Sequence, residues 1–175
     1  MPDSVRYFEL LGVIDYMYYN GFTPKLDVNF GSNTTEFVAG ISDSNCNSLP
    51  FNSCIIDPDW FENTNLKKVT LNNIEVDNSN FTVSNFSNIE YLKISNYAMI
   101  DLNFLDSSTN LTQLYLENIS GITSFSGANN LLDLTIDNLP DLSFFDVSSH
   151  TNLINLKLLD LPLTCLLYTS PSPRD

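Results

Sequence analysis

The sequence predicts an α/β solenoid, in which short parallel β-strands stack into one sheet and the chain returns behind it through irregular or short helical segments. Two observations predict this fold class. A ten-residue pattern of apolar positions recurs five times, and its starts lie 23, 22, 20 and 22 residues apart. Within every copy, two apolar residues lie two positions apart, which is the spacing of one face of a β-strand. One such unit cannot bury its apolar row alone, so neighbouring units are expected to stack.

The five copies lie within residues 65–164 and form repeats of 20–23 residues. Their paired strand positions are Val69 and Leu71, Leu92 and Ile94, Leu114 and Leu116, Leu134 and Ile136, and Leu156 and Leu158. An earlier apolar residue leads into each strand, at Leu66, Ile89, Leu111, Leu131 and Leu153. All of these side chains are predicted to point into one shared core. The asparagine that opens each copy is expected to be a turn residue; these are Asn65, Asn88, Asn110, Asn130 and Asn152.

This pattern resembles the leucine-rich repeat, whose core motif LxxLxLxxN is matched at its apolar positions in every copy. The resemblance implies a curved horseshoe that carries the parallel sheet on its concave face. The chain departs from the motif in one respect, because the polar residue stands one position early. It is found at Asn73, Asn96, Asn118, Asn138 and Asp160. The turn after each strand is therefore expected to differ from the common geometry of that family.

Residues 1–64 are predicted to form an N-terminal cap for the solenoid. Within the cap, residues 4–20 are predicted to form a helix, because apolar and aromatic side chains fall at helical spacing from Tyr7 to Tyr18. A strand is expected in EFVAGIS, where Phe37 and Ala39 alternate with other residues. A helix followed by a divergent, cysteine-containing unit resembles the N-terminal caps of extracellular leucine-rich repeat domains.

The last eleven residues, CLLYTSPSPRD (165–175), resemble the translation of a transposase-based sequencing-library adapter along their whole length. A natural polar tail is the alternative. On the adapter hypothesis, the natural chain continues beyond Thr164 with further repeats, and Cys165 is not a native cysteine. The remaining pair, Cys46 and Cys54, encloses seven residues and is predicted to form a small disulfide in an oxidising compartment. Two free thiols are the alternative.

Composition and motifs narrow the possible functions. The formal net charge of −14 repels phosphate, so nucleic acid and anionic membrane surfaces are not expected partners. The sequence contains no run of eighteen apolar residues, so it predicts no membrane span. The sequence also lacks a glycine-rich phosphate loop, a nucleophile elbow and a cluster of metal ligands. We therefore predict no enzymatic activity, no cofactor and no metal, and we expect His150 to be a surface turn residue.

Residues between the core positions are predicted to point outward from the sheet in four columns. The columns are Lys67, Glu90, Thr112, Leu132 and Ile154; Lys68, Tyr91, Gln113, Asp133 and Asn155; Thr70, Lys93, Tyr115, Thr135 and Lys157; and Asn72, Ser95, Glu117, Asp137 and Leu159. Four lysines and four acids among them make this face formally neutral on an acidic chain. Its apolar members near the last repeat form a second patch, at Leu132, Ile154 and Leu159.

Two tyrosines mark the candidate binding site on this face. Tyr91 and Tyr115 lie on neighbouring predicted strands, and Lys68, Lys93 and Gln113 surround them. Tyrosine offers a flat apolar body with a polar tip, and lysine supplies charge, a mixture that is enriched at recognition surfaces. These five residues are predicted to contact a protein or glycan ligand. An ordinary solvated sheet face is the alternative.

The function expected from these patterns is non-catalytic recognition by a cell-surface or secreted protein. One alternative is an intracellular scaffold or adaptor that binds a signalling partner through the same face. Another is the sensor part of a receptor whose effector domain is missing. The cysteine pair and the cap resemblance favour an extracellular location, whereas the absence of a secretory signal after Met1 favours a cytoplasmic one.

Overall fold

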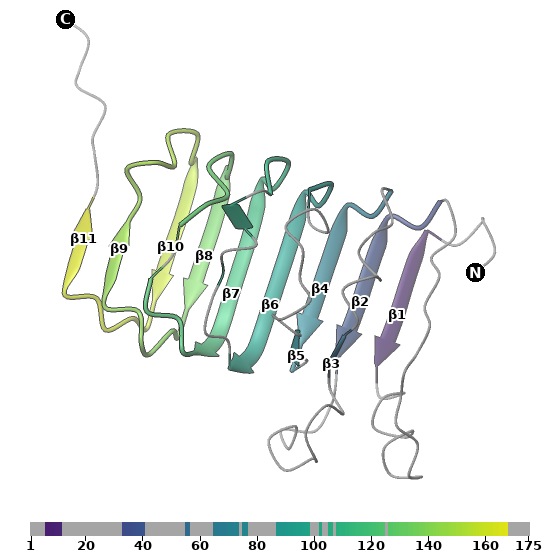
Figure 1. Ribbon diagram of the computed structural model, residues 1–175, viewed down its shortest axis with the longest axis horizontal. Coiled ribbons are helices and arrows are strands. Elements are labelled where there is room, and N and C mark those ends of the chain that lie inside the picture. Colours follow the sequence, from purple (N-terminus) through teal and green to yellow (C-terminus); the bar gives the residue numbers. More distant parts are fainter. Residues whose placement is uncertain are drawn as a thin grey trace, which may run out of the picture.

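A seven-stranded parallel sheet forms one side of the protein (Figure 1). The structure, a computed structural model, describes residues 6–11, 33–40, 55–56, 65–73, 75–76, 87–98, 102, 105–106, 108–124 and 126–167. In spatial order, the sheet contains β1 (Tyr7–Leu11), β2 (Glu36–Gly40), β4 (Lys68–Asn72), β6 (Tyr91–Ala98), β7 (Gln113–Ser120), β8 (Asp133–Asp137) and β10 (Asn155–Leu159). Each strand pairs only with its neighbours in chain order within this sheet, as expected of a solenoid.

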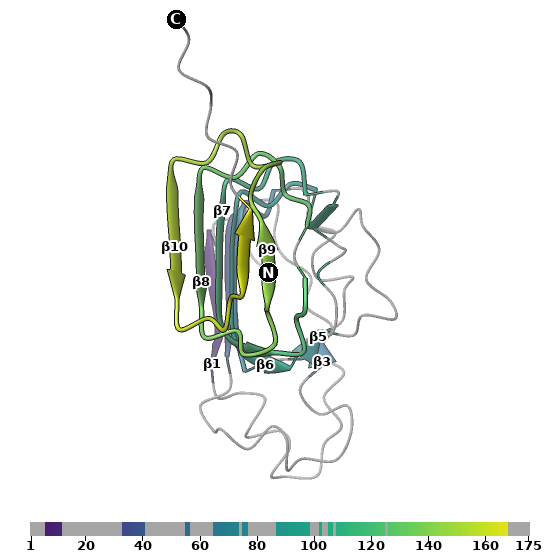
Figure 2. The ribbon, with the colours of Figure 1, turned by 90° about the vertical axis from the view of Figure 1, so that its left-hand side faces the viewer.

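Shorter strands form two further parallel pairs outside the large sheet. Strand β9 (Phe144–Asp146) pairs in parallel with β11 (Cys165–Leu167), and β3 (Ile55–Ile56) pairs with β5 (Glu75–Val76). Figure 2, which looks along the stack, shows β9 and β11 in a layer beside the large sheet. Strand β11 includes the first three residues of the segment predicted to be adapter-derived. Strand addition uses backbone hydrogen bonds, so a foreign apolar tripeptide can pair there as readily as a native one.

The core lies behind the large sheet, and it contains the residues that the repeat pattern predicted. The paired strand positions of β4, β6, β7 and β8 are at most 1% exposed. The residues that lead into these strands are equally buried. In the last repeat, Leu153, Leu156 and Leu158 are only partly buried, because β10 has a packed neighbour on one side. Stacking of successive turns thus supplies the burial, as in other repeat architectures.

The predicted strand near Phe37 is confirmed, but the predicted helix is wrong where the structure describes it. Residues Tyr7–Leu11 form β1, which pairs in parallel with β2. The N–H groups of Thr35 and Glu36 both donate to the carbonyl oxygen of Arg6. A short apolar run such as YFELL fits either periodicity, and the neighbouring strand decides between them. The rest of the predicted helix, residues 12–20, and both Cys46 and Cys54 lie outside the described residues.

The fold class also needs correction, because the part of the chain that the structure describes contains no α-helix. A single helical turn at residues 105–106 is the only helical geometry in it. The other described return segments are not helical and place Ile122 and Phe145 in the core, where the single turn also places Leu105. Few residues separate one strand from the next, and glycine and proline interrupt these segments. The described part of the chain is therefore a β-solenoid, and the helical cap of the predicted α/β fold is not found in it.

One hydrogen-bond pattern is repeated at all six junctions of the large sheet. The carbonyl oxygen just before each strand accepts from two consecutive N–H groups of the next turn, at 2.8–3.1 Å. These carbonyls belong to Arg6, Thr35, Lys67, Glu90, Thr112 and Leu132. Such a double acceptance is a local bulge, so two consecutive residues can face the same side of the sheet. This accounts for the first two outward columns, whose described members are all half-buried or exposed.

The displaced polar residue of each repeat has a backbone role. Asn73, Asn96, Asn118, Asn138 and Asp160 all have a positive φ, between 48° and 58°. Asparagine and aspartate tolerate this left-handed conformation better than other residues with a side chain. Figure 1 shows that β6 and β7 curve toward their C-terminal ends; Asn96 belongs to β6 and Asn118 to β7. The next residue then turns into the core, where Ile119 and Leu139 are fully buried.

Candidate functional site

The five predicted site residues lie together on the open face, defined as the side of the large sheet that points away from the core. Lys68, Tyr91 and Gln113 are successive backbone partners across β4, β6 and β7. Lys93 and Tyr115 are partners two positions further along the same strands. The second, third and fourth predicted columns are thus reproduced residue by residue in the sheet register. Side chains two positions apart on one strand share a face, so the five form one cluster.

The two tyrosines are in direct contact at the centre of this cluster. Their ring centroids lie 5.3 Å apart and the ring planes are tilted by 38°, a favourable arrangement for an aromatic pair. Burial raises the pKa of Tyr91 above 10.0, and the neighbouring Tyr115 and Glu36 raise it further, while Lys93 opposes them. Tyr91 is therefore a neutral hydroxyl at physiological pH. The pair presents an aromatic surface that is half-buried by its neighbours.

Two of the open-face lysines are held by acids. Lys93 Nζ lies 2.9 Å from Glu117 Oε2, and Lys67 Nζ lies 3.1 Å from Glu90 Oε1. All four side chains are at least 36% exposed, so each pair contributes little stability. The pairs nevertheless fix where the ammonium groups stand. Among the described residues, Lys68 and Lys157 are the open-face lysines outside an ion pair, and only Lys68 adjoins the tyrosines.

A carboxylate that sequence reasoning did not assign to the site orients Gln113. Asp133 accepts a hydrogen bond from Gln113 Nε2 at 3.0 Å and a second one from Asn155 Nδ2. These bonds, from Asn155 first and then from Gln113, lower the pKa of Asp133 below 3.8. Asp133 therefore remains a carboxylate well below neutral pH. It stands beside Gln113 in the same register row, which is the sequence signal that could have identified it.

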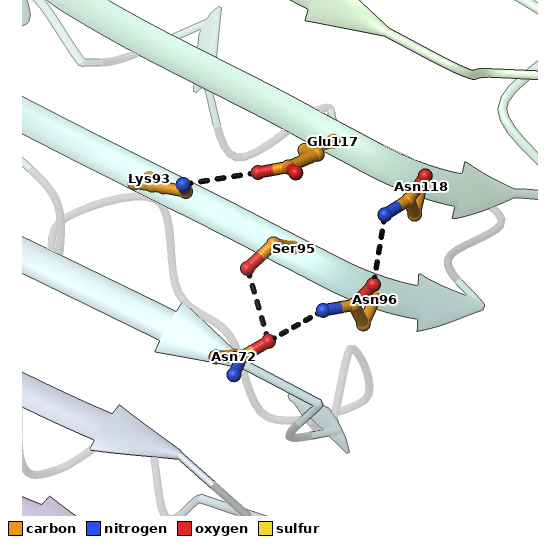
Figure 3. A network of polar contacts seen from close by, with 6 residues as sticks. All are labelled: Asn72, Lys93, Ser95, Asn96, Glu117 and Asn118. Carbon is orange, nitrogen blue, oxygen red and sulfur yellow. Dashed lines mark hydrogen bonds and ion pairs between the residues drawn. The ribbon is translucent and has the colours of Figure 1, made fainter. Parts of the chain in front are cut away.

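A ladder of asparagine side chains borders the open face where the strands end (Figure 3). Asn118 Nδ2 donates to Asn96 Oδ1 at 2.9 Å, and Asn96 Nδ2 donates to Asn72 Oδ1 at 2.7 Å. Ser95 Oγ also donates to Asn72 Oδ1, at 3.1 Å. Asn138, directly after the end of β8, continues the ladder by donating to Asn118 Oδ1 at 2.9 Å. The ladder links four strands and fixes the border of the candidate site.

A second ladder lies at the start of the strands and uses the opening asparagines. Asn110 Nδ2 donates to the carbonyl oxygen of Ser87 at 2.6 Å, and Asn130 Nδ2 donates to that of Thr109 at 2.7 Å. Both asparagines lie in turns, as predicted. Each bond joins one turn of the solenoid to the preceding turn. The amides of these residues therefore support the fold.

The open face extends beyond the five predicted strands. Strand β2 adds Glu36 to the row of Lys68 and Tyr91. The face formed by the five predicted strands was predicted to be neutral, and Glu36 adds one acid beside it. Glu36 acts on Tyr91, whose pKa it helps to raise. The strand belongs to the segment that was predicted to be a cap, and for this reason the prediction omitted it.

His150 is buried, and its expected place at the surface is wrong. Its side chain is 4% exposed, Nε2 lies 3.0 Å from the carbonyl oxygen of Gly127, and Nδ1 lies 3.3 Å from Ser149 Oγ. Burial lowers the pKa of His150 below 6.5, although the bond to Gly127 and the nearby Asp146 oppose this shift. Within the described ranges, no three histidine, cysteine, aspartate or glutamate side chains are close enough to hold a metal ion.

Comparison with known proteins assigns neither a family nor a function to the chain. No protein-family model matches the chain, and no curated protein matches it. Among the residues that the structure describes, no helix has the length and apolar character needed to cross a membrane.

Proposed function

We propose that this chain is a recognition domain of the leucine-rich repeat type and that it binds a protein ligand through the open face. The observation that carries the proposal is the contact between Tyr91 and Tyr115, with ring centroids 5.3 Å apart on adjacent strands. Paired aromatic side chains with charged and amide neighbours are typical of interface anchors. The repeat pattern and the parallel solenoid support the family.

The roles within the cluster follow from its contacts. Tyr91 and Tyr115 supply apolar contact area at a low cost in side-chain entropy. Lys68 supplies the positive charge, because Lys93 is already paired with Glu117. Gln113 supplies an amide whose orientation is fixed by Asp133. Because these neighbours are fixed before a ligand arrives, less ordering is needed on binding.

The same face suits more than one biological setting. A cell-surface or secreted protein would use it toward an extracellular ligand, and an intracellular adaptor would use it toward a signalling partner. The sensor part of a receptor would use it toward the ligand that the receptor detects. A glycan is the second ligand class, since tyrosine rings can also pack against sugar rings. We favour a protein, because the lysine, the amide and the carboxylate beside the rings complement side chains of both signs.

The test uses the purified 175-residue chain as a probe on arrays of purified protein ectodomains, cytosolic domains and glycans. For any ligand found, Kd is then measured for the wild type, for the Tyr91→Ala/Tyr115→Ala variant and for Thr135→Ala. Thr135 lies beside Tyr115 in the same register row and is the matched control. The double variant should weaken binding at least about tenfold, as for side chains that anchor an interface, while the control should not. Equal affinity of all three proteins would refute the assignment.

A further inference from the structure

The candidate site carries charges of opposite sign at its two ends. One register row of the open face contains, as successive backbone partners on β4, β6, β7 and β8, the residues Lys68, Tyr91, Gln113 and Asp133. A cation, an aromatic ring, an amide and a carboxylate thus follow one another across four strands. Tyr115, whose ring contacts Tyr91, lies beside the middle of this row. The row therefore runs from positive to negative, with the aromatic pair between the two ends.

The positive end is not neutralised by the ion pairs of the open face. These pairs join Lys67 to Glu90 and Lys93 to Glu117, and Figure 3 shows the second of them. The four charges cancel in pairs. Lys68 is exposed and lies outside both pairs, so its ammonium group is available to a ligand.

The negative end contains two carboxylates on β8. Asp133 and Asp137 lie four residues apart on this strand, so both point to the open face. Neither forms an ion pair within the described part of the chain. Asp133 accepts hydrogen bonds from Gln113 and Asn155, but a carboxylate has about four acceptor positions, so some remain for a ligand. Lys157 on the next strand can offset only one of the two charges.

The distance between the ends matches an extended polypeptide. Three junctions separate Lys68 from Asp133, and neighbouring strands lie about 4.8 Å apart, so the ends are about 14 Å apart. In an extended chain, the first and fifth of five residues point the same way and lie about 13 Å apart. The third residue also points that way, and it falls midway, between the columns of Tyr91 and Tyr115. Glu36 stands beyond Lys68 and repels an acidic group placed past that end.

We propose that the open face binds an extended protein segment with an acidic, an apolar and a basic side chain at alternate positions. The inference rests on the proposed function, because it uses the same tyrosine pair. The acidic side chain contacts Lys68, the apolar one packs on the two tyrosines, and the basic one contacts Asp133. Each exposed ion pair contributes little affinity, but the two together disfavour ligands with the wrong charge at either end.

The test uses the 175-residue chain and blocked synthetic peptides. The mixed peptide is Thr-Glu-Thr-Phe-Thr-Lys-Thr, and two single-sign peptides carry Glu or Lys at both charged positions. Threonine favours the extended conformation. Kd is measured by nuclear magnetic resonance titration at about 0.15 M salt, where the screening length of about 8 Å limits the long-range pull of the net charge of −14 on basic peptides.

The wild type should bind the mixed peptide at least about threefold more tightly than either single-sign peptide, as expected when an exposed ion pair becomes a like-charge contact. A peptide whose Glu and Lys stand only two positions apart cannot reach both ends and should lose this advantage. Equal affinity for the mixed and single-sign peptides would overturn the proposal, as would no binding at all. Tight binding of the shortened spacing would do the same.

Charge variants of the two ends should change the order of affinities. Lys68→Glu makes both ends negative, so the two-Lys peptide should become the preferred one. Asp133→Asn/Asp137→Asn neutralises the other end, so the mixed peptide should lose its advantage over the two-Glu peptide. Lys157→Ala removes a lysine away from the tyrosines and should keep the wild-type order. Circular dichroism checks each fold, and if the double variant does not fold, Lys68→Glu alone decides.

An unchanged order in Lys68→Glu would also overturn the proposal. The Tyr91→Ala/Tyr115→Ala variant separates this inference from the proposed function. It should weaken all of the peptides and keep the mixed one preferred. If it weakens none of them, the role of the tyrosines is refuted while the charge preference stands. If it weakens all of them but the wild type shows no preference, the proposed function stands and the charge inference is refuted.

Discussion

Asn118 donates its side-chain amide to Oδ1 of Asn96 at 2.9 Å, and both residues have a positive φ, 53° and 58°. Asparagine thus meets two separate demands at the ends of β6, β7 and β8. The left-handed backbone favours glycine, asparagine and aspartate. The ladder requires a side chain that both donates and accepts, which among these three only asparagine provides. The recurring asparagine of this repeat is therefore explained by its geometry.

Two substitutions at Asn118 should separate these demands. Asn118→Gly removes the ladder bonds but keeps an easy positive φ, whereas Asn118→Ala removes the bonds and strains the backbone. The alanine variant should be less stable than the glycine variant by about 1 kcal/mol, the lower end of the cost of a left-handed residue. Urea unfolding followed by circular dichroism measures both. An alanine variant as stable as the glycine variant would show that the backbone imposes no demand.

Gly127 should tolerate no side chain, because its Cα approaches the preceding turn closely. A Cβ there would lie 2.5 Å from Asp106 Oδ1 and 2.8 Å from the Asp106 backbone nitrogen, and φ is 86°. Gly127→Ala should cost roughly 2–4 kcal/mol of unfolding free energy, from backbone strain and overpacking together. Gly121→Ala, at a φ of 83°, is the reference for strain alone. Thermal and urea unfolding of both variants make the comparison, and equal losses would argue against the close contact.

His150 should make the protein less stable in mildly acidic solution. Its folded-state pKa is lowered by burial, so the unfolded chain binds the proton more readily. The unfolding free energy should therefore be unaffected above about pH 6.5 and should fall as the pH drops below that value toward the folded-state pKa. His150→Gln should remove this slope. Urea unfolding at a series of pH values tests it, and parallel curves for the two proteins would contradict the prediction.

Tyr91 should titrate at a higher pH than an ordinary tyrosine. Burial and the contact with Tyr115 both raise its pKa above 10.0. Replacing Tyr115 with phenylalanine removes the second contribution, so the pKa of Tyr91 should fall but stay raised. Alkaline ultraviolet titration of the wild type, Tyr91→Phe and Tyr115→Phe resolves this residue by difference. If Tyr115→Phe leaves the titration of Tyr91 unchanged, the two hydroxyl groups are not coupled.

The register of the large sheet could be predicted from the sequence because every turn repeats the same requirement. Leu114 and Leu116 must both reach the core, and a shift by one residue would expose both. Aligning the repeats therefore aligned the strands, and Tyr91 came to lie beside Tyr115. The placement of the candidate site follows from this alignment alone.

The first strand could not be predicted, because local spacing does not record which neighbour is available. Residues 7–11 suit a helix when taken alone and suit a strand beside β2. His150 was misplaced for a similar reason. A lone histidine in SSHTN resembles a surface turn, and its burial depends on the return segment around Gly127, which the strand pattern does not describe. Likewise, the pairing of Lys93 with Glu117 depends on side-chain conformations that residue spacing does not specify.

In the described part of the chain, β1 and β10 each pair with one strand of the large sheet, and this arrangement determines how the molecule responds to force. These strands lie at opposite ends of the sheet, so tension applied between them passes through all six junctions in series. Elements in series carry equal tension, and the weakest yields first. Among the junctions whose side chains the structure describes, that of β8 with β10 has the least complete apolar cover, so it should part before those others. The solenoid would then unfold stepwise, one turn at a time, instead of in a single event.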